Sequence, residues 1–166
     1  FSCSVNGKGY VFGGSNGISP QGQVYEYDPV ADTWTIATAY PDGGAAYLSG
    51  FVVDDKVYVG LGSPDGFGGS QLFYEYDPAT VTWTQKADYG AGATYGASSF
   101  TIGNKAYVGS HVTGGNDWWE FDPIANTWTQ MSPAPFSSSD MTAFSIGDLG
   151  YYVHYGEIYE FDPGQG

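Results

Sequence analysis

A short phrase that occurs four times constrains the fold of this 166-residue chain more than any other feature. It reads aromatic-Glu-aromatic-Asp-Pro, and successive copies begin 49, 45 and 40 residues apart. In the first three copies a Trp follows the Asp after six positions. Because these residues repeat together, we expect them to build one structural unit several times and to pack within it. The repeated aromatic, Asp and Trp positions are Tyr27, Asp28 and Trp34; Tyr76, Asp77 and Trp83; Phe121, Asp122 and Trp128; and Phe161 and Asp162.

The length of the repeat predicts the fold class. A period of 40 to 50 residues with several strands per unit is typical of a β-propeller. In the second repeat, alternation with a period of two predicts strands over residues 50–53, 57–62, 72–77 and 82–87. No segment has helical periodicity of useful length. We therefore predict an all-β fold, an arc of about four blades with four antiparallel strands in each and almost no helix.

Two landmarks make the sequence resemble the kelch repeat, namely the Gly13-Gly14 doublet and the Tyr-Asp-Pro…Trp phrase. The resemblance covers essentially the whole chain, although the later repeats lose the doublet. The sequences of residues 74–87 and 95–108 look especially like those of secreted kelch proteins of Bacteroidota. Many of those proteins carry sorting tails for type IX secretion. No such tail is visible in this sequence. The resemblance implies that the protein is extracellular or lies on the cell surface.

Some kelch-like propellers are enzymes, so the resemblance also raises the question of catalysis. Galactose oxidase uses a copper site with a Tyr–Cys crosslink and His ligands, and sialic acid mutarotases of this fold use Arg and Glu. This chain has no Arg, and its single cysteine, Cys3, aligns with the core positions Phe51, Phe100 and Phe144. Neither active site carries over, and we expect that the chain is not an enzyme.

The repeats divide a single domain, residues 1–166, into blades. Aligned on the Tyr that follows the first turn of each repeat, the blades cover about residues 1–39, 43–88, 92–133 and 137–163. The last blade lacks the Trp strand that closes each earlier blade. We therefore expect an incomplete fourth blade with an unpaired strand edge, and an arc with two uncovered apolar faces.

Three explanations of the incomplete arc stay open. The chain is a piece of a longer propeller, or other chains complete it as a ring or fibre, or it closes as a compact four-bladed ring. We favour the first explanation. In the first two cases the missing blades, from the same longer chain or from other chains, are the partners of this segment, and residues 158–161 pair with a strand from outside it.

Charge and cysteine content exclude several classes of protein. The chain has 18 acidic residues, four Lys and no Arg, which gives a net charge of −14. Because phosphate contacts are made mostly by Arg and Lys, we expect no binding to nucleic acid or to anionic membrane surfaces. No apolar run approaches the roughly 20 residues of a membrane-spanning helix. The lone Cys3 excludes an internal disulfide framework and a cysteine zinc site.

Few residues have the chemistry of a catalytic or metal site. His111 and His154 fall at the end of a second strand, one blade apart, but no third ligand is spaced with them. The Glu of the repeated phrase occupies one strand position in every blade, which indicates an architectural role. We predict no catalytic residue, no metal ion and no cofactor.

Strand alternation predicts that the long loops and the links between blades share one side of the arc. These segments vary in length and are rich in Tyr, Asp, Gly and Ser. Variable loops on a rigid scaffold are the usual binding surface, and Tyr or Phe can stack on a sugar or anchor a protein contact. The candidate binding residues are Tyr40, Asp42, Asp65, Phe67, Tyr89, Tyr95, His111, Asn116 and Asp117.

The predicted function is therefore that of a non-catalytic binding module, secreted or on the cell surface, which presents its loops to a protein or a glycan. One alternative is a structural subunit of an extracellular assembly or fibre that other chains complete. A less favoured alternative is part of a carbohydrate-active enzyme.

Overall fold

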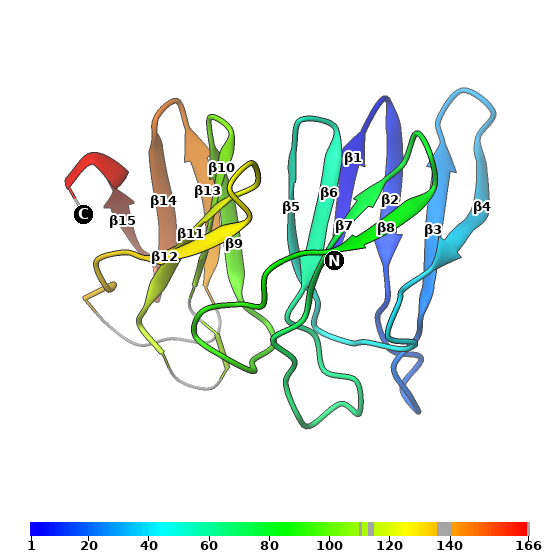
Figure 1. The fold of residues 1–166 in the computed structure, drawn as a ribbon, viewed down its shortest axis with the longest axis horizontal. Helices are drawn as coiled ribbons and strands as arrows, with labels where there is room; N and C mark the ends of the chain where they lie inside the picture. Colours follow the sequence, from blue (N-terminus) through cyan, green and yellow to red (C-terminus); the bar gives the residue numbers. More distant parts are fainter. Residues whose placement is uncertain (110, 113–114, 136–140, 166) are drawn as a thin grey trace.

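The computed structural model describes residues 1–109, 111–112, 115–135 and 141–165. Their strands form four separate antiparallel sheets, which stand side by side as the blades of an arc (Figure 1). Within each sheet the strands follow sequence order, and the first strands of neighbouring blades contact one another along the inside of the arc. The all-β propeller arc predicted from the repeat is thus confirmed.

Over the described residues, the first three blades have four strands and the fourth has three, as the missing Trp strand predicts. In the second blade every observed strand begins and ends within two residues of its predicted bounds. The strands are β1 (Ser2–Val5), β2 (Lys8–Phe12), β3 (Gln23–Asp28) and β4 (Thr33–Ala39); β5 (Ser49–Val53), β6 (Lys56–Gly60), β7 (Phe73–Asp77) and β8 (Thr82–Gln85); β9 (Ser98–Ile102), β10 (Lys105–Gly109), β11 (Trp118–Asp122) and β12 (Thr127–Gln130); and β13 (Thr142–Ile146), β14 (Leu149–His154) and β15 (Glu157–Phe161).

Helix is almost absent from the part of the chain that the structure describes. It is limited there to a single turn of 3₁₀ helix, η1 (Pro163–Gln165). No helix of the described residues has the length and apolar character needed to cross a membrane.

The Asp of each repeated phrase closes the turn that follows it. The Asp28 carboxylate accepts hydrogen bonds from the amides of Val30 and Ala31 at 2.9 and 3.1 Å. These backbone donors hold the pKa of Asp28 below its usual value. Asp77, Asp122 and Asp162 accept equivalent bonds from the amides two residues ahead. The Asp therefore fixes the outer turn by a purely local interaction, which explains its repetition.

The Glu of each phrase lies opposite a Tyr on the neighbouring strand. Glu26 accepts hydrogen bonds from the Tyr10 hydroxyl at 2.7 Å and from Lys8 Nζ at 2.5 Å. The hydrogen bond from Lys8, and then that from Tyr10, lowers the pKa of Glu26. In the third blade the Tyr107 hydroxyl and Lys105 hold Glu120 in the same way, at 2.8 and 2.5 Å. These carboxylates are therefore engaged in pairing strands within one blade.

Neighbouring blades pack through aromatic side chains. In the second blade Tyr76 of β7 and Trp83 of β8 form a ring pair with centroids 4.8 Å apart. This pair packs against Tyr10 and Phe12 of the first blade. In the third blade Phe121 and Trp128 pack in the same way on the second blade, and in the fourth Phe161 packs on Phe100 and Tyr107 of the third. The second, third and fourth blades thus present aromatic residues of their outer strands to the blade before them.

Among the described residues, no blade lies over the outer face of the first blade or of the fourth. At the first blade, Trp34 is 57% exposed, and Tyr25 and Ile36 beside it are also exposed. At the fourth blade, Phe144 is 40% and Ile158 is 68% exposed. We call these surfaces the first-blade face (Tyr25, Tyr27, Trp34 and Ile36) and the last-blade face (Phe144, Ile146, Tyr151 and Ile158). Trp34, expected from its repeat to pack as Trp83 and Trp128 do, thus stacks on Tyr27 but remains largely in solvent.

Replacing Trp83 by Ala should lower the free energy of unfolding by about 3 kcal/mol, because it empties the junction between the first two blades. Trp34→Ala is the matched control, since it changes the same position where no blade lies over it. We expect that variant to lose less than about 1 kcal/mol. Denaturant unfolding of dilute, monomeric protein measures both values. Equal losses would contradict the assignment of Trp83 to a packed junction.

Replacing Glu26 by Gln should cost about 1 kcal/mol at pH 7, because it removes the charge that binds Lys8 and Tyr10. The pKa of Glu26 is lowered on folding, so this stabilisation is present above the pKa of the unfolded chain, about 4.3, and is lost as pH falls further. The difference between variant and wild type should therefore shrink below pH 4. Glu160→Gln is the control, since Leu149 replaces the lysine there. A difference that is the same at pH 7 and pH 3 would refute the pairing.

Candidate functional site

The arc has two sides that differ in their connections (Figure 1). One side carries the short turns β1–β2 and β3–β4 and their equivalents, and we call it the turn side. The opposite side carries the longer β2–β3 and β6–β7 connections, their equivalents, and the links from one blade to the next. We call it the loop side. All nine candidate binding residues belong to loop-side segments.

The structure buries two of these candidates, Tyr40 and Tyr89, between blades. The ring of Tyr40 stands edge-on to Trp83 at 5.7 Å, and that of Tyr89 stands edge-on to Trp128 at 5.0 Å. Their amides donate to loop carbonyls of their own blades at 2.7 and 2.9 Å. Both residues follow a Trp by six positions, a repeated spacing that indicates a packing role. They are therefore part of the junctions and not of an accessible surface.

His111 is also buried, within a polar cluster at the loop end of the third blade. His111 Nε2 lies 3.2 Å from Asp117 Oδ1, and Trp119 Nε1 donates to Asp117 Oδ2 at 2.7 Å. The ring of Tyr89 stands edge-on to the imidazole at 6.2 Å. The structure thus brings together three predicted candidates, Tyr89, His111 and Asp117, but uses them to join the link to the third blade. Among the described residues, no group of three or more His, Cys, Asp and Glu is placed to hold a metal ion.

The remaining polar candidates order the loops. Asp65 accepts hydrogen bonds from the amides of Phe67 and Gly68 at 2.8 and 2.6 Å. Asn116 donates to the carbonyl of Ala134 at 2.8 Å, which ties one loop to the next link. These contacts fix the loop backbone and so determine which side chains are exposed to solvent.

Asp42 lies beside a small cavity of about 80 Å³ between the first two blades, lined also by Tyr40, Pro64 and Leu72. Its carboxylate accepts the Tyr74 hydroxyl at 2.8 Å. Burial, and then the hydrogen bond to Asp42, raises the pKa of Tyr74 to about 12. Tyr74 therefore stays protonated at neutral pH and keeps this hydrogen bond to the loop.

The loop side is distinguished by exposed aromatic rings. Phe67 is 88% exposed, Tyr155 94% and Tyr47 60%. The ring of Tyr47 lies 5.7 Å from that of Tyr95, at an interplanar angle of 41°. Every other exposed aromatic side chain of the described residues belongs to the first-blade or last-blade face. Phe67 and Tyr95 were candidates from the sequence, whereas Tyr47 and Tyr155 were not.

Tyr47 and Tyr155 share an unusual backbone conformation. Their φ angles are +56° and +47°, in the left-handed region that side chains rarely adopt. Gly96, which takes the place of Tyr47 in the next link, has a φ of +64°. A glycine at position 47 would adopt this turn without cost, so a tyrosine there is not explained by the fold alone.

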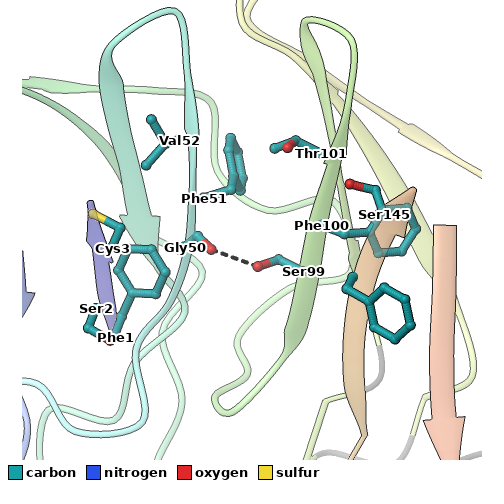
Figure 2. Close-up of a pocket in the computed structure, with 11 residues that line it drawn as sticks. Phe1, Ser2, Cys3, Gly50, Phe51, Val52, Ser99, Phe100, Thr101 and Ser145 are labelled. Carbon is teal, nitrogen blue, oxygen red and sulfur yellow. Dashed lines mark hydrogen bonds between the residues drawn. The ribbon is translucent and has the colours of Figure 1, made fainter. Parts of the chain in front are cut away.

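A groove of about 380 Å³ runs along the inner strands of the arc. Figure 2 shows Phe1, Cys3 and Val52 on one wall and Ser99, Thr101 and Ser145 toward the other. Ser99 Oγ donates to the carbonyl of Gly50 across the groove at 2.6 Å. Burial raises the pKa of the Cys3 thiol to about 12, so at neutral pH it is a neutral wall group and not a nucleophile. The groove therefore presents hydroxyl and aromatic groups.

Comparison with known proteins supports the assignment of the fold. Residues 2–39, the first blade, match the family model described as the Kelch motif. Among solved structures, the chain is similar to the one titled "Structure of YjhT", with a TM-score of 0.75 and 20% sequence identity over 92% of this chain and 57% of that chain. A search of curated proteins finds no match. The chain thus spans little more than half the length of that structure, and it folds as an arc of a kelch-type β-propeller whose first blade carries a kelch motif.

Proposed function

We propose that this arc is a non-catalytic binding module, secreted or on the cell surface, whose loop side takes a protein or a glycan. The observation that supports the proposal most directly is the placement of exposed aromatic rings. Tyr47, Phe67 and Tyr155 are exposed on the loop side, while the described residues of the turn side expose none. Flat aromatic rings stack on sugar faces and anchor protein contacts, and they lose little conformational freedom on binding.

The backbone of the loop side supports the same proposal. Tyr47 holds a left-handed conformation that costs about 1 kcal/mol in comparison with glycine. The carboxylate of Asp65 holds the loop that carries Phe67 through two amide hydrogen bonds. A surface whose rings are held in place before binding loses less entropy when a ligand arrives.

Two further observations support the proposed location and the lack of catalysis. The resemblance of the repeats to secreted kelch proteins of Bacteroidota supports export, by a route such as type IX secretion. The described His and Asp side chains of the loop side make contacts within the fold, as His111, Asp117 and Asp65 do. This engagement favours binding over chemistry.

Replacing Tyr47 by Gly provides a sharp test, because glycine suits the left-handed backbone and should leave the free energy of unfolding unchanged or slightly higher. A glycan array and a phage-displayed peptide library serve as probes. We expect the wild type to bind at least one glycan of the array or at least one peptide of the library. Tyr47→Gly and Phe67→Ala should each weaken that binding about tenfold or more.

Val30→Ala, an exposed aliphatic position on the turn side, is the control and should bind as the wild type does. The proposal fails if neither probe yields a binder, or if the turn-side variant loses binding to the same extent as the two loop-side variants.

The uncovered end faces favour a second candidate function, that of a structural subunit. Trp34 and Ile158 are exposed although their equivalents in the other blades lie within junctions. Apolar faces of this kind are typical of surfaces that another chain covers. In this candidate, copies of the chain or other chains complete a larger assembly.

A further inference from the structure

The small cavity beside Asp42 marks a place where two successive junctions differ. At the junction of the second and third blades, His111 takes the place of Gly62 and Asp117 takes the place of Leu72. Those two polar side chains contact one another, with His111 Nε2 3.2 Å from Asp117 Oδ1. The junction of the first two blades has a glycine and a leucine instead, and a cavity of about 80 Å³ remains between them.

Tyr74 and Trp119 take the same place in the second and third blades but act differently on the link that crosses them. The Trp119 ring lies so close to Gly90 that a Cβ atom at that glycine would clash with it. Tyr74 instead donates its hydroxyl to Asp42 Oδ1 at 2.8 Å. The second link has Ala91 where the first has Asp42. Of these two junctions, the hollow one is therefore the one that holds a carboxylate.

Burial shows how the cavity opens at the loop side. Tyr40, Ala45 and Gly62 are buried and form its inner part, while Asp42 and Pro64 are exposed residues at its rim. The volume of about 80 Å³ is enough for a few groups of the size of a water molecule. The cavity therefore fits the end of one extended side chain. It lies between two described blades and includes no residue of the first-blade or last-blade face.

The Asp42 carboxylate has no cation of its own chain beside it. Its Oδ1 accepts the Tyr74 hydroxyl, and among the described residues no group donates to Oδ2. No Lys or Arg lies in the loop-side segments. The chain has four lysines, and each forms an ion pair elsewhere, with Glu26, Asp77, Glu75 or Glu120. Because the net charge is −14, the field of the protein favours a ligand that supplies the missing cation.

We propose that this cavity receives a lysine side chain of a partner protein, with the ammonium group at Asp42 Oδ2 and the methylene groups along Leu72 and Pro64. The inference rests on the proposed function, binding at the loop side, and names the chemistry of the ligand. Lysine has a flexible apolar stem that ends in a compact charge, which matches a cavity with apolar walls and one carboxylate. A neutral glycan would leave that carboxylate unpaired.

The contacts of Asp42 also favour lysine over arginine. Arginine binds a carboxylate best as a planar fork that donates to both oxygens. Here Oδ1 is already engaged by the Tyr74 hydroxyl. An ammonium group is a point charge and needs only the oxygen that is left. The hydrogen bond from Tyr74 is therefore the feature that sets the preference between the two basic residues.

The two segments that line the cavity also carry exposed aromatic rings of the loop side. Residues 40–48 link the first blade to the second and include Tyr47, and residues 61–72 join β6 to β7 and include Phe67. A protein segment anchored at the cavity therefore lies over the same loops as these rings. The lysine supplies the charge complementarity of the contact, and the rings supply apolar area.

The test uses peptides that differ at one position. Peptides selected from the phage-displayed library are synthesised with lysine, arginine, norleucine or Nε-acetyllysine at the site of the shared basic residue, and calorimetric titration measures their affinities. We expect the selected peptides to share a lysine. Norleucine or acetyllysine should weaken binding at least tenfold, because each removes the charge, and arginine should bind more weakly than lysine.

Three variants locate the contact. Asp42→Asn should weaken the lysine peptide about tenfold and leave the norleucine peptide unchanged. Tyr74→Phe frees Oδ1 and should reduce the difference between the lysine and arginine peptides. Asp55→Asn is the control, since it removes the same charge from an exposed turn-side residue whose left-handed backbone suits asparagine. Circular dichroism and unfolding midpoints should show that all three variants fold as the wild type does.

A small probe tests the cavity without a selected peptide. Nα-acetyl-lysine N-methylamide, titrated to high millimolar concentration, should shift the backbone amide resonances of residues 42–45 in the wild type and not in Asp42→Asn. The corresponding norleucine compound should shift neither. If no glycan and no peptide binds, the proposed function fails, and this titration still decides whether the cavity takes a lysine.

Three results would overturn the inference. The lysine probe leaves residues 42–45 unchanged, or the selected ligands are neutral glycans or peptides that bind equally well with norleucine, or Asp42→Asn binds the lysine peptide as tightly as Asp55→Asn does. In the second of these cases binding at the loop side stands while the lysine site is rejected.

Discussion

The packing of an aromatic pair on the preceding blade is the interaction on which the rest of the structure depends. Tyr76 with Trp83, and Phe121 with Trp128, fill the space between sheets that have no strand in common. A four-stranded sheet alone has two faces to cover, and the described part of the chain offers almost no helix to cover them. Each blade therefore needs its neighbours, and the links, loops and inner groove take their positions from this stacking.

Much of the fold could be predicted from the sequence because its signals are local. The alternation of β7 and the Asp77-Pro78 turn act within a few residues, and the predicted strands of the second blade agree with the structure to within two residues. The missing fourth strand of the last blade was equally visible. The exposure of Trp34 could not be predicted, because the burial of a repeated residue depends on the blade beside it and not on its own repeat.

The candidate site was harder to predict for the same reason. Tyr40 and Tyr89 looked like loop residues, but the links that carry them cross the next blade, and the side chains are trapped against its Trp. The sequence signal for their packing role was that both follow a Trp by six positions. Tyr47 and Tyr155 gave no such signal, because they are held outward by a left-handed backbone that tyrosine rarely adopts. Exposure of this kind is set by chain geometry and follows no residue pattern.

The junction between the third and fourth blades bears on the order in which the described blades open. Contacts between blades join only neighbours, so stability is close to a sum of blade terms and junction terms along one dimension. Among the described residues, the fourth blade contributes three strands, and its junction with the third blade has Ala134 where the other two junctions have a link tyrosine. Its amides should exchange with solvent through local opening long before those of the second blade. Among the described blades, the fourth should therefore open first.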